Sequence, residues 1–489
     1  MALGSISFVQ EPQATANQVP VITNWNPIIP YTAYQDDISG LFYFKLILEV
    51  RLDSVSGTVI AKLKQRRNGY PADISADEAR ATFDVRDIVN SQLEDTIADQ
   101  NDTTKSIHTL GANVVAKPFS LNSNQVKTIS VIAYQEYSEL ASATPSEDTT
   151  PNVNDTKKYI AASLPLETAR GTVDFQNTAF QVFQLDDTSG RFLSDVQQSS
   201  GSVVASSVYR NYVQDTDYHT LGFLNGLATD PSTTREFDSE LRYLYVKYYE
   251  ADGTEINSGV TKRLSNASSY GGCKPDEADG EIDADTERLI YVGCGPANLE
   301  AQTYDNDAKP SNNSGWAYYK VYANDGGGGG GTNKSADYYF IKQDGSCKGF
   351  KVRRLAWRNS LGCYDYFNFK MKSTQTIDVT RNNYETVLGN FNSNMYSYDN
   401  FDRGKRTRQT TALIKETINT DWITEQDAQL LEGLIMSTNV EVIENADTDY
   451  TVPVMVTDTS FVRKTVANDK IQIQYTIQIE YANPLNTNS

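Results

Sequence analysis

Histidine, cysteine and carboxylate side chains are the residues of this chain that could do chemistry. A nucleophilic triad needs an imidazole base beside a serine or cysteine. His108 and His219 stand in polar surroundings with no flanking motif, although each begins the same four residues, His-Thr-Leu-Gly. We therefore expect two exposed loop histidines and no catalytic triad. The sequence predicts a protein that is not an enzyme.

The four cysteines also predict no metal centre. Cys273, Cys294, Cys347 and Cys363 contain no CxxC pair, and the two distant histidines do not complete a zinc set. We expect reduced cysteines. A disulfide between Cys273 and Cys294 is the alternative, although folding in the cytosol would leave that pair open.

An acidic segment and a glycine run are the remaining candidates for a bound ion or cofactor. The carboxylates of residues 276–287 could hold calcium as a structural ion, but their spacing misses the EF-hand pattern and favours a solvated loop. The six glycines of residues 326–331 precede Lys334 and Ser335, which come two residues too late for a phosphate loop. No cofactor or metal is predicted.

Seven basic residues stand out because the chain carries a formal net charge of -20. They are Arg353, Arg354, Arg358, Arg403, Lys405, Arg406 and Arg408. Opposite charges at two ends of a protein suit docking between subunits, where complementary potentials fix register and partner. The alternative is a solvated basic turn.

Three apolar residues near the N-terminus, Trp25, Ile28 and Ile29, are the other interface candidates. They lie in the stretch "VPVITNWNPIIPY", whose prolines exclude a regular helix and favour an extended segment. We expect residues 1–37 to form an extended arm that lies on the body of the protein or crosses to a neighbouring copy.

Composition excludes two classes of partner. A pI near 4.6 argues against nucleic acid, whose affinity for proteins comes largely from Lys and Arg. There is no apolar run of about 20 residues, and the N-terminus lacks a basic and an apolar signal region. We expect a soluble protein with no membrane insertion.

Periodicity predicts strands over most of the chain. Residues 41–50, 374–380 and 470–481 alternate apolar and polar side chains. Residues 403–418 predict a basic turn followed by a long strand. By contrast, residues 141–158 have almost nothing to bury, and we expect a long exposed loop there.

Three further patterns complete the expected elements. Thr424 and Asp427 form a capping box for a helix over residues 425–436. The tyrosine-rich residues 243–253 and 316–326 resemble each other, which suggests two equivalent strands. Residues 355–369, "LAWRNSLGCYDYFNF", predict a β-hairpin with Trp357 in a core.

The length and the strand patterns together predict a mainly β, multi-domain protein. A chain of 489 residues exceeds the usual domain length of roughly 100 to 150 residues. We expect four segments: the arm over 1–37, a first β-sandwich over 38–165, a second β-sandwich region with long loops over 166–369, and a smaller mixed α+β domain with one helix over 370–489.

Several stretches resemble the virion structural proteins of tailed bacteriophages. The resemblance lies in "RLAWRNSLGCYDYFNF", "DWITEQDAQLLEGLIMSTNVEVI", "VPVMVTDTSFVRKTVANDKIQIQYTIQIEYAN" and the N-terminal "NPIIPYT", "GLFYFKLILEV" and "TVIAKLKQRRNGY". It is strongest to tail-associated proteins of phages of marine and Bacteroidetes-type hosts. Residues 257–300 and the glycine run depart from the pattern.

The resemblance implies a non-enzymatic structural protein, made in the host cytoplasm and present in many copies in the tail or baseplate of a virion. It implies fibronectin- or immunoglobulin-like sandwiches in the N-terminal part. The expected partners are other copies of the chain and neighbouring virion proteins, as in a ring that connects the tail to adhesins. Two alternatives stay open: a receptor-binding tail fibre or adhesin subunit that recognises a host-surface glycan, and a capsid decoration protein.

Overall fold

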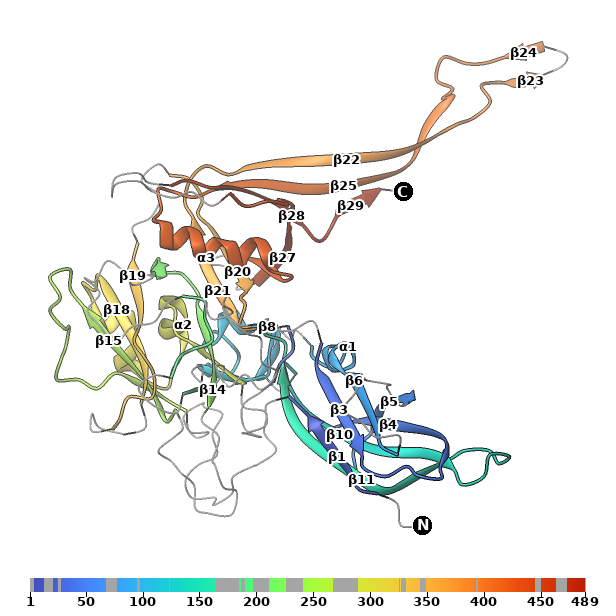
Figure 1. Ribbon diagram of the computed structural model, residues 1–489. Coiled ribbons are helices and arrows are strands. Elements are labelled where there is room, and N and C mark those ends of the chain that lie inside the picture. Colours follow the sequence, from blue (N-terminus) through green and yellow to red (C-terminus); the bar gives the residue numbers. More distant parts are fainter. Residues whose placement is uncertain are drawn as a thin grey trace. The chain divides into compact units, whose positions relative to one another are not determined.

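The fold is mainly β, as the sequence predicts, and is built from several sheets (Figure 1). The computed structural model describes residues 4–12, 21–24, 28–66, 77–94, 97–122, 124–163, 184–185, 190–196, 211–225, 241–266, 289–324, 326, 331–343, 349–392, 395–444, 450–462 and 473–488. The acidic segment 276–287, Cys273, Cys347, Trp25 and most of the glycine run lie outside these residues.

The chain divides into two compact units. Unit 1 comprises Met1–Lys342 and Asn359–Asp365, and unit 2 comprises Gln343–Arg358 and Tyr366–Ser489. This is a coarser division than the four segments expected from the sequence, and those four boundaries stay a prediction.

Two sheets of unit 1 share one hydrophobic core. The first has the strand order β1 (Ile6–Gln10), β3 (Pro30–Gln35), β6 (Ala79–Asp84). The second has the order β2 (Val21–Ile22), β11 (Ser146–Ile160), β10 (Val126–Ser138), β4 (Phe42–Leu52), β5 (Val59–Arg66). Tyr31 and Phe83 of the first sheet and Leu48 and Val131 of the second are fully buried in this core. The Tyr31 hydroxyl also bonds the Tyr159 hydroxyl at 2.8 Å, which ties the sheets together.

Two segments of these sheets bear on the expectations. The described part of residues 1–37 forms the extended strands β1, β2 and β3, which pair within unit 1, and lying on the body is one of the two placements that we expected for it. Residues 141–158, expected as a loop, mostly form β11, which pairs with β10 from Val126↔Ile160 to Tyr137↔Ser146. Most β11 side chains before residue 156 face water or are half-buried, so the strand lacks the apolar alternation by which strands are recognised in sequence.

Two more sheets complete unit 1. One has the order β12 (Gln184–Leu185), β14 (Thr220–Asn225), β17 (Leu289–Gly293), β9 (Phe119–Leu121). The other has the order β13 (Asn211–Val213), β19 (Tyr338–Lys342), β18 (Tyr318–Asn324), β15 (Tyr243–Tyr249), β16 (Arg263–Ser265). The remaining elements are β7 (Ala98–Asp99), β8 (Asp102–Ser106), α1 (Arg86–Asn90), α2 (Pro296–Ala301) and the 3₁₀ helices at Ile107–Thr109, Asn306–Ala308 and Pro310–Asn313.

The two similar tyrosine-rich segments are neighbours in one sheet. β15 pairs antiparallel with β18 in the register Tyr243↔Asn324 to Tyr249↔Tyr318. Tyr249 stacks on Tyr318, with ring centroids 4.9 Å apart. Their likeness therefore reflects a direct cross-strand aromatic pairing, which stabilises such a ladder.

Unit 2 is built on one long antiparallel sheet with a helix beside it. Its strand order is β21 (Tyr364–Phe369), β20 (Arg353–Arg358), β26 (Val440–Glu444), β27 (Tyr450–Val456), β28 (Thr476–Tyr481), β25 (Lys405–Asn419), β22 (Thr374–Glu385). β29 (Leu485–Asn488) also pairs with β25, and β23 (Asn390–Asn392) pairs with β24 (Met395–Ser397). Helix α3 (Glu425–Met436) packs against β20 and begins with the predicted capping box of Thr424 and Asp427.

The predicted hairpin 355–369 is present as β20 and β21, and Gly362 turns the chain at a φ of +87°. Its strands join the sheet of unit 2, where β20 pairs with β26 through Leu355↔Val442 and Trp357↔Val440. We expected the hairpin to belong with the middle of the chain, and its turn, Asn359–Asp365, does group with unit 1. A partner strand more than 80 residues away leaves no local mark in the sequence.

Replacing Trp357 with alanine is expected to lower the free energy of unfolding by about 3 to 5 kcal/mol, because the indole is fully buried and its loss leaves a cavity. Trp422→Ala is the matched control, since that side chain is 56% exposed in the same unit, and we expect a change within about 0.5 kcal/mol. Urea unfolding followed by circular dichroism measures both variants. Equal midpoints for the two variants would show that Trp357 is not a core residue.

Candidate functional site

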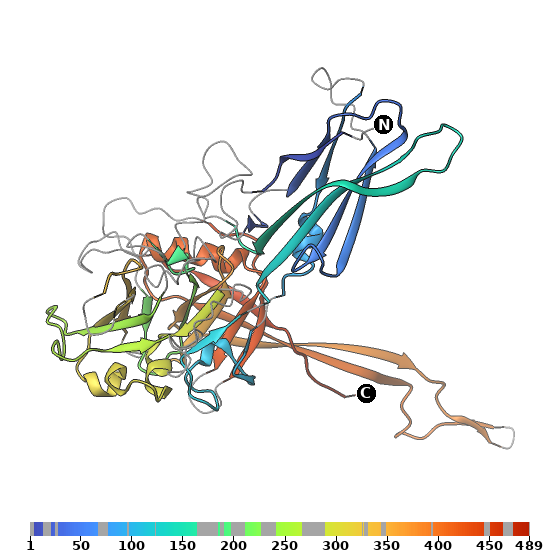
Figure 2. The same ribbon diagram turned by 90° about the horizontal axis from the view of Figure 1, so that it is seen from below.

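The most exposed feature of unit 2 is the ribbon formed by β22 and the outer part of β25. We call residues 374–414 the arm. Figures 1 and 2 show it projecting from the rest of the sheet, with β23 and β24 at its tip. All twelve residues of β22 are exposed.

Local sequence explains why this ribbon forms. Threonine, valine, isoleucine and tyrosine, which favour strands, recur along both of its strands. The two strands pair from Thr374↔Thr417 to Glu385↔Lys405, with a register shift between Asn382 and Asn383. Among the described strands none pairs with the outer edge of β22. A two-stranded ribbon of this kind is marginally stable in water unless something packs on it.

One face of the arm is apolar near its root. Ile377 lies opposite Ile414, Val379 lies opposite Ala412, and Ala412 lies opposite Leu485 of β29. We call these five residues the stripe. Side chains on the same face of β25 and β28 closer to the body, Ile418 and Ile479, are fully buried. The core face of the sheet thus continues into the arm, where Ile377 is 57% exposed.

The tip of the arm adds further apolar side chains. Phe401 is 79% exposed and Met395 is 73% exposed, and the rings of Tyr396 and Tyr398 are also exposed. Scattered apolar residues are normal on a protein surface, but a contiguous set marks an interaction site. The arm therefore has the character of a binding surface.

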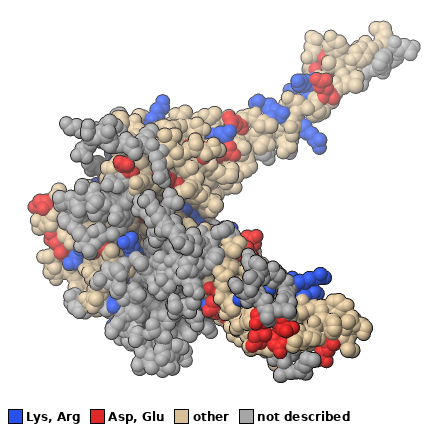
Figure 3. All heavy atoms as spheres, in the orientation of Figure 1, with Lys and Arg blue, Asp and Glu red and all other residues tan. Residues whose placement is uncertain are grey.

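Four of the seven predicted basic residues lie together on the arm. Arg403, Lys405, Arg406 and Arg408 are all exposed. Within the described part of the chain none of them forms an ion pair, although Arg406 donates a hydrogen bond to the backbone oxygen of Arg403 at 3.3 Å. Figure 3 shows basic side chains along the arm on the face in view. We call these four residues the basic cluster.

The other predicted interface residues are placed differently. Arg353 is buried and binds Glu416 and Glu444, at 2.7 and 2.8 Å. Arg354 is also buried, and its guanidinium donates to Asn368 Oδ1 at 2.9 Å. Both therefore serve the interior of unit 2. Arg358 ends β20 and is half-buried.

The N-terminal candidates are also separated by the fold. Ile29 is buried in the core shared by the two sheets, whereas Ile28 is exposed. Trp25 lies outside the described residues.

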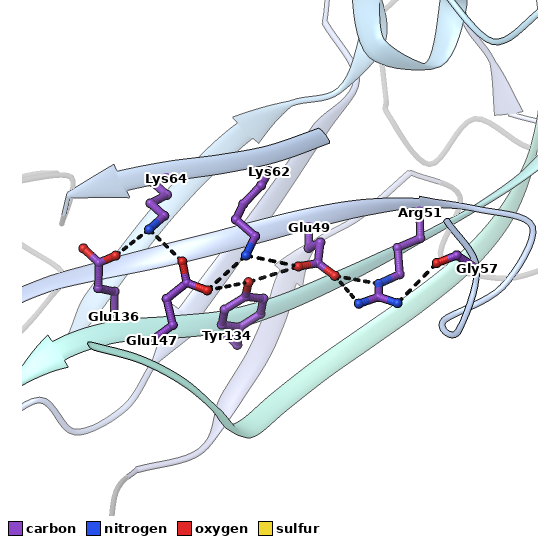
Figure 4. Close-up of polar contacts among 8 residues, drawn as sticks. All are labelled: Glu49, Arg51, Gly57, Lys62, Lys64, Tyr134, Glu136 and Glu147. Atoms are coloured by element: carbon purple, nitrogen blue, oxygen red, sulfur yellow. Dashed lines mark hydrogen bonds and ion pairs between the residues drawn. The ribbon is translucent and has the colours of Figure 1, made fainter. Parts of the chain in front are cut away.

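A second charged feature, on the β4, β5, β10 and β11 strands of unit 1, was not found from the sequence. Figure 4 shows its side chains in one connected row: Glu49, Arg51, Lys62, Lys64, Tyr134, Glu136 and Glu147. We call this set the ionic ladder. Lys64 lies 2.5 Å from Glu136 and 2.8 Å from Glu147, and Lys62 lies 3.0 Å from Glu147. Each carboxylate of the ladder forms an ion pair with a Lys or Arg side chain of the same set. The ladder therefore links the strands of the sheet to one another.

Hydrogen bonds from Lys64 and then Lys62 lower the pKa of Glu147 to about 2. The same network raises the pKa of Lys62, chiefly through hydrogen bonds with Tyr134 and Glu147. Local sequence could not reveal the ladder, because residue 62 and residue 147 meet only through strand pairing.

Unit 1 also contains a buried pair of carboxyl groups. Asp365 Oδ1 accepts from the Ser194 hydroxyl at 2.5 Å, and Asp365 Oδ2 accepts from the Asp195 backbone N–H at 2.9 Å. Asp195 in turn accepts from the Ser360 hydroxyl and backbone N–H, at 2.5 and 3.0 Å. Burial, and then the Asp195 carboxylate, raise the pKa of Asp365 to about 7.

The two histidines are buried, so the expectation of exposed loop histidines is wrong. Asn298 of α2 holds both segments: its side-chain oxygen accepts from His219 N at 2.7 Å, and its amide donates to His108 O at 2.9 Å. The repeated His-Thr-Leu-Gly thus marks two backbone segments that share one amide. Cys294 and Cys363 are buried, and the Cys294 thiol donates to the His219 backbone oxygen at 3.5 Å.

Among the described residues no three His, Cys, Asp or Glu side chains gather as metal ligands would. No helix in the described part of the chain has the length and apolar character needed to cross a membrane. No protein-family model matches the chain, and no curated protein matches it. The arm is therefore the feature from which we argue function.

Asp365→Asn is expected to reduce a pH dependence of stability that Asp365 shares with Asp195, because burial raises the pKa of both carboxyl groups. An unfolded aspartate has a pKa of about 4, and the folded value is about 7. The folded state therefore binds more protons between these values, and the free energy of unfolding falls as pH rises from about 4 to about 7. Thermal melts across that range measure the slope. Glu139→Gln, at an exposed carboxyl of the same unit, should leave it unchanged, and an unaltered slope in the Asp365 variant would contradict the prediction.

Glu147→Gln is expected to have the opposite pH signature. Because the folded pKa of about 2 lies below the unfolded value of about 4.3, this carboxylate contributes stability above about pH 4.3, and the contribution disappears as pH falls toward about 2. The variant should be less stable than wild type at neutral pH, and the difference should shrink on acidification. High salt should reduce the difference, since the pairs are partly exposed. A difference independent of pH would refute the role of the charge.

Proposed function

We propose that this chain is a non-enzymatic structural subunit that works by assembly in the tail or baseplate of a tailed-phage virion. It would be present in many copies and contact other copies and neighbouring virion proteins. A ring-like connector between the tail and its adhesins is the place that the resemblance of its segments favours.

The observation that carries the proposal is the arm. It exposes Ile377, Phe401 and other apolar side chains on a ribbon that the described part of the chain leaves unpaired on one edge. Exposed apolar surface and free strand edges are hazards that proteins keep when a partner covers them. Assembly supplies such a partner, and among the described residues both histidines are buried. His108 and His219 pack as T-shaped neighbours of Tyr364 and Phe340.

The virion part of the proposal rests on the resemblance of the chain to tailed-phage structural proteins. Two of the stretches that carry it fall on β20 and β21 and on α3 with β26. These three strands belong to the sheet that continues into the arm. The surface argued for assembly and much of the resemblance thus belong to the same sheet.

A receptor-binding adhesin is the second candidate, because Tyr396, Tyr398 and Phe401 are exposed at the arm tip. Exposed aromatic rings on a projecting element can stack on sugars. Binding of the isolated chain to host-surface glycan would favour this candidate, and self-assembly without such binding would favour the first.

Removing residues 381–410 and joining Thr380 to Thr411 through Asn-Gly tests the proposal, because these two threonines are opposite each other in the ladder and Asn-Gly forms a tight hairpin. We expect a melting temperature close to that of wild type and loss of the chain from purified particles, measured by quantitative mass spectrometry. The full-length chain, supplied from the same vector, is the control. Absence of the full-length chain from particles would disprove the virion assignment.

A further inference from the structure

We infer that the arm of one copy docks on unit 1 of a second copy of this chain, so that copies join head to tail. This inference rests on the proposed function and names the partner of the arm.

The first observation is the distribution of charge between the two units. Unit 1 contains 46 Asp and Glu against 27 Lys and Arg, a net charge of -19. Unit 2 contains 17 against 16, a net charge of -1. Nearly all of the net negative charge of the chain therefore belongs to the unit that does not carry the arm.

The second observation is that the basic cluster forms no ion pair among the described residues, although Glu385 lies opposite Lys405 in the ladder. Its four cations fall within six residues. Other cations are neutralised locally: Lys415 at the arm root pairs with Asp378 at 2.8 Å, and Lys62 and Lys64 pair within the ionic ladder. Complementary potentials of this kind select a partner and its orientation.

The third observation is the combination of an apolar stripe with charges farther along the same ribbon. Interfaces that hold copies together bury apolar side chains at their centre and keep charged side chains at the rim. The stripe can supply the buried contact, and the basic cluster can set the register against an acidic surface. Burial of the stripe would also stabilise a ribbon that is marginal alone.

These observations disfavour a contact between two arms. The arm contains five basic and four acidic side chains, so a second arm offers no excess of negative charge. Unit 1 of another copy does offer an excess of negative charge. Because the two surfaces differ, the contact is heterologous, and such contacts close into rings or continue as filaments.

Zero-length cross-linking of isotopically mixed protein tests the inference. Equal amounts of ¹⁴N- and ¹⁵N-labelled full chain are mixed at the highest soluble concentration and treated with a carbodiimide, which couples the Lys405 amine to carboxylates in contact with it. We expect peptides that join Lys405 to unit 1 carboxylates with one isotope on each side. Glu385 lies opposite Lys405 on the same ribbon, so a single-isotope cross-link between these two residues is expected in any case. If every cross-link from Lys405 to unit 1 carried a single isotope, the arm would fold back on its own copy, and mixed cross-links from arm to arm alone would mean a different partner surface; both results overturn the inference.

Variants separate the contributions of charge and apolar contact. Changing the four residues of the basic cluster to glutamine should raise the Kd of self-association about tenfold or more, as measured by sedimentation. Arg403→Lys, Arg406→Lys and Arg408→Lys together keep the charge and are the matched control. Self-association of the wild type should also weaken between about 0.1 and 1 M salt.

For the stripe, Ile377→Thr with Val379→Thr keeps strand propensity and should weaken association to a similar extent. Thr376→Ser with Thr380→Ser, on the opposite face, is its control. If copies associate equally well in all variants, the arm is not the contact and the inference fails. The proposed function would still stand if the chain is found in purified particles. A chain that neither self-associates nor enters particles fails on both counts.

Discussion

The sheet of unit 2 and the arm depend on one strand, β25, because it belongs to both. β25 pairs with β22 over the length of the arm, and on its other edge with β28 near Asn419 and with β29 near Thr410. Backbone groups at its root are thereby satisfied from both sides, and Ile418 is fully buried. Farther out, the same strand keeps only β22 beside it. The transition from core to projecting ribbon therefore takes place within one continuous strand.

That transition explains why the arm has an apolar face. Side chains alternate along a strand, so the face that is buried at Ile418 and Ile479 is the face that Ile414 and Ala412 share farther out. A ribbon that continues a core face beyond its core leaves apolar side chains in water. Residues of this kind are stable on a surface when a partner covers them, which is the physical link between the fold and assembly.

Charge is handled differently in the ionic ladder of unit 1 and in the basic cluster of the arm. In unit 1 the ionic ladder pairs its carboxylates with lysines across strands, and Asp195 and Asp365 are held by hydroxyl and backbone donors. These groups bind partners within their own unit. On the arm, Arg406 and its neighbours are exposed and bind no carboxylate among the described residues.

The sequence by itself determined the elements whose signals are local. Alternation fixed the strands that include Ile477 and Ile377, the capping box of Thr424 and Asp427 fixed the start of α3, and Gly362 marked the turn of the hairpin. It also singled out the basic cluster by composition. Only the tertiary structure decided which of the predicted basic residues are buried, since Arg353 meets Glu416 through strands far apart in the chain. It likewise made β11 a strand and buried both histidines, because pairing with β10 and a shared contact to Asn298 depend on distant segments that leave no periodic pattern nearby. The stripe could also be recognised only in the tertiary structure, because its residues come from three strands and the register of these strands brings them onto one face.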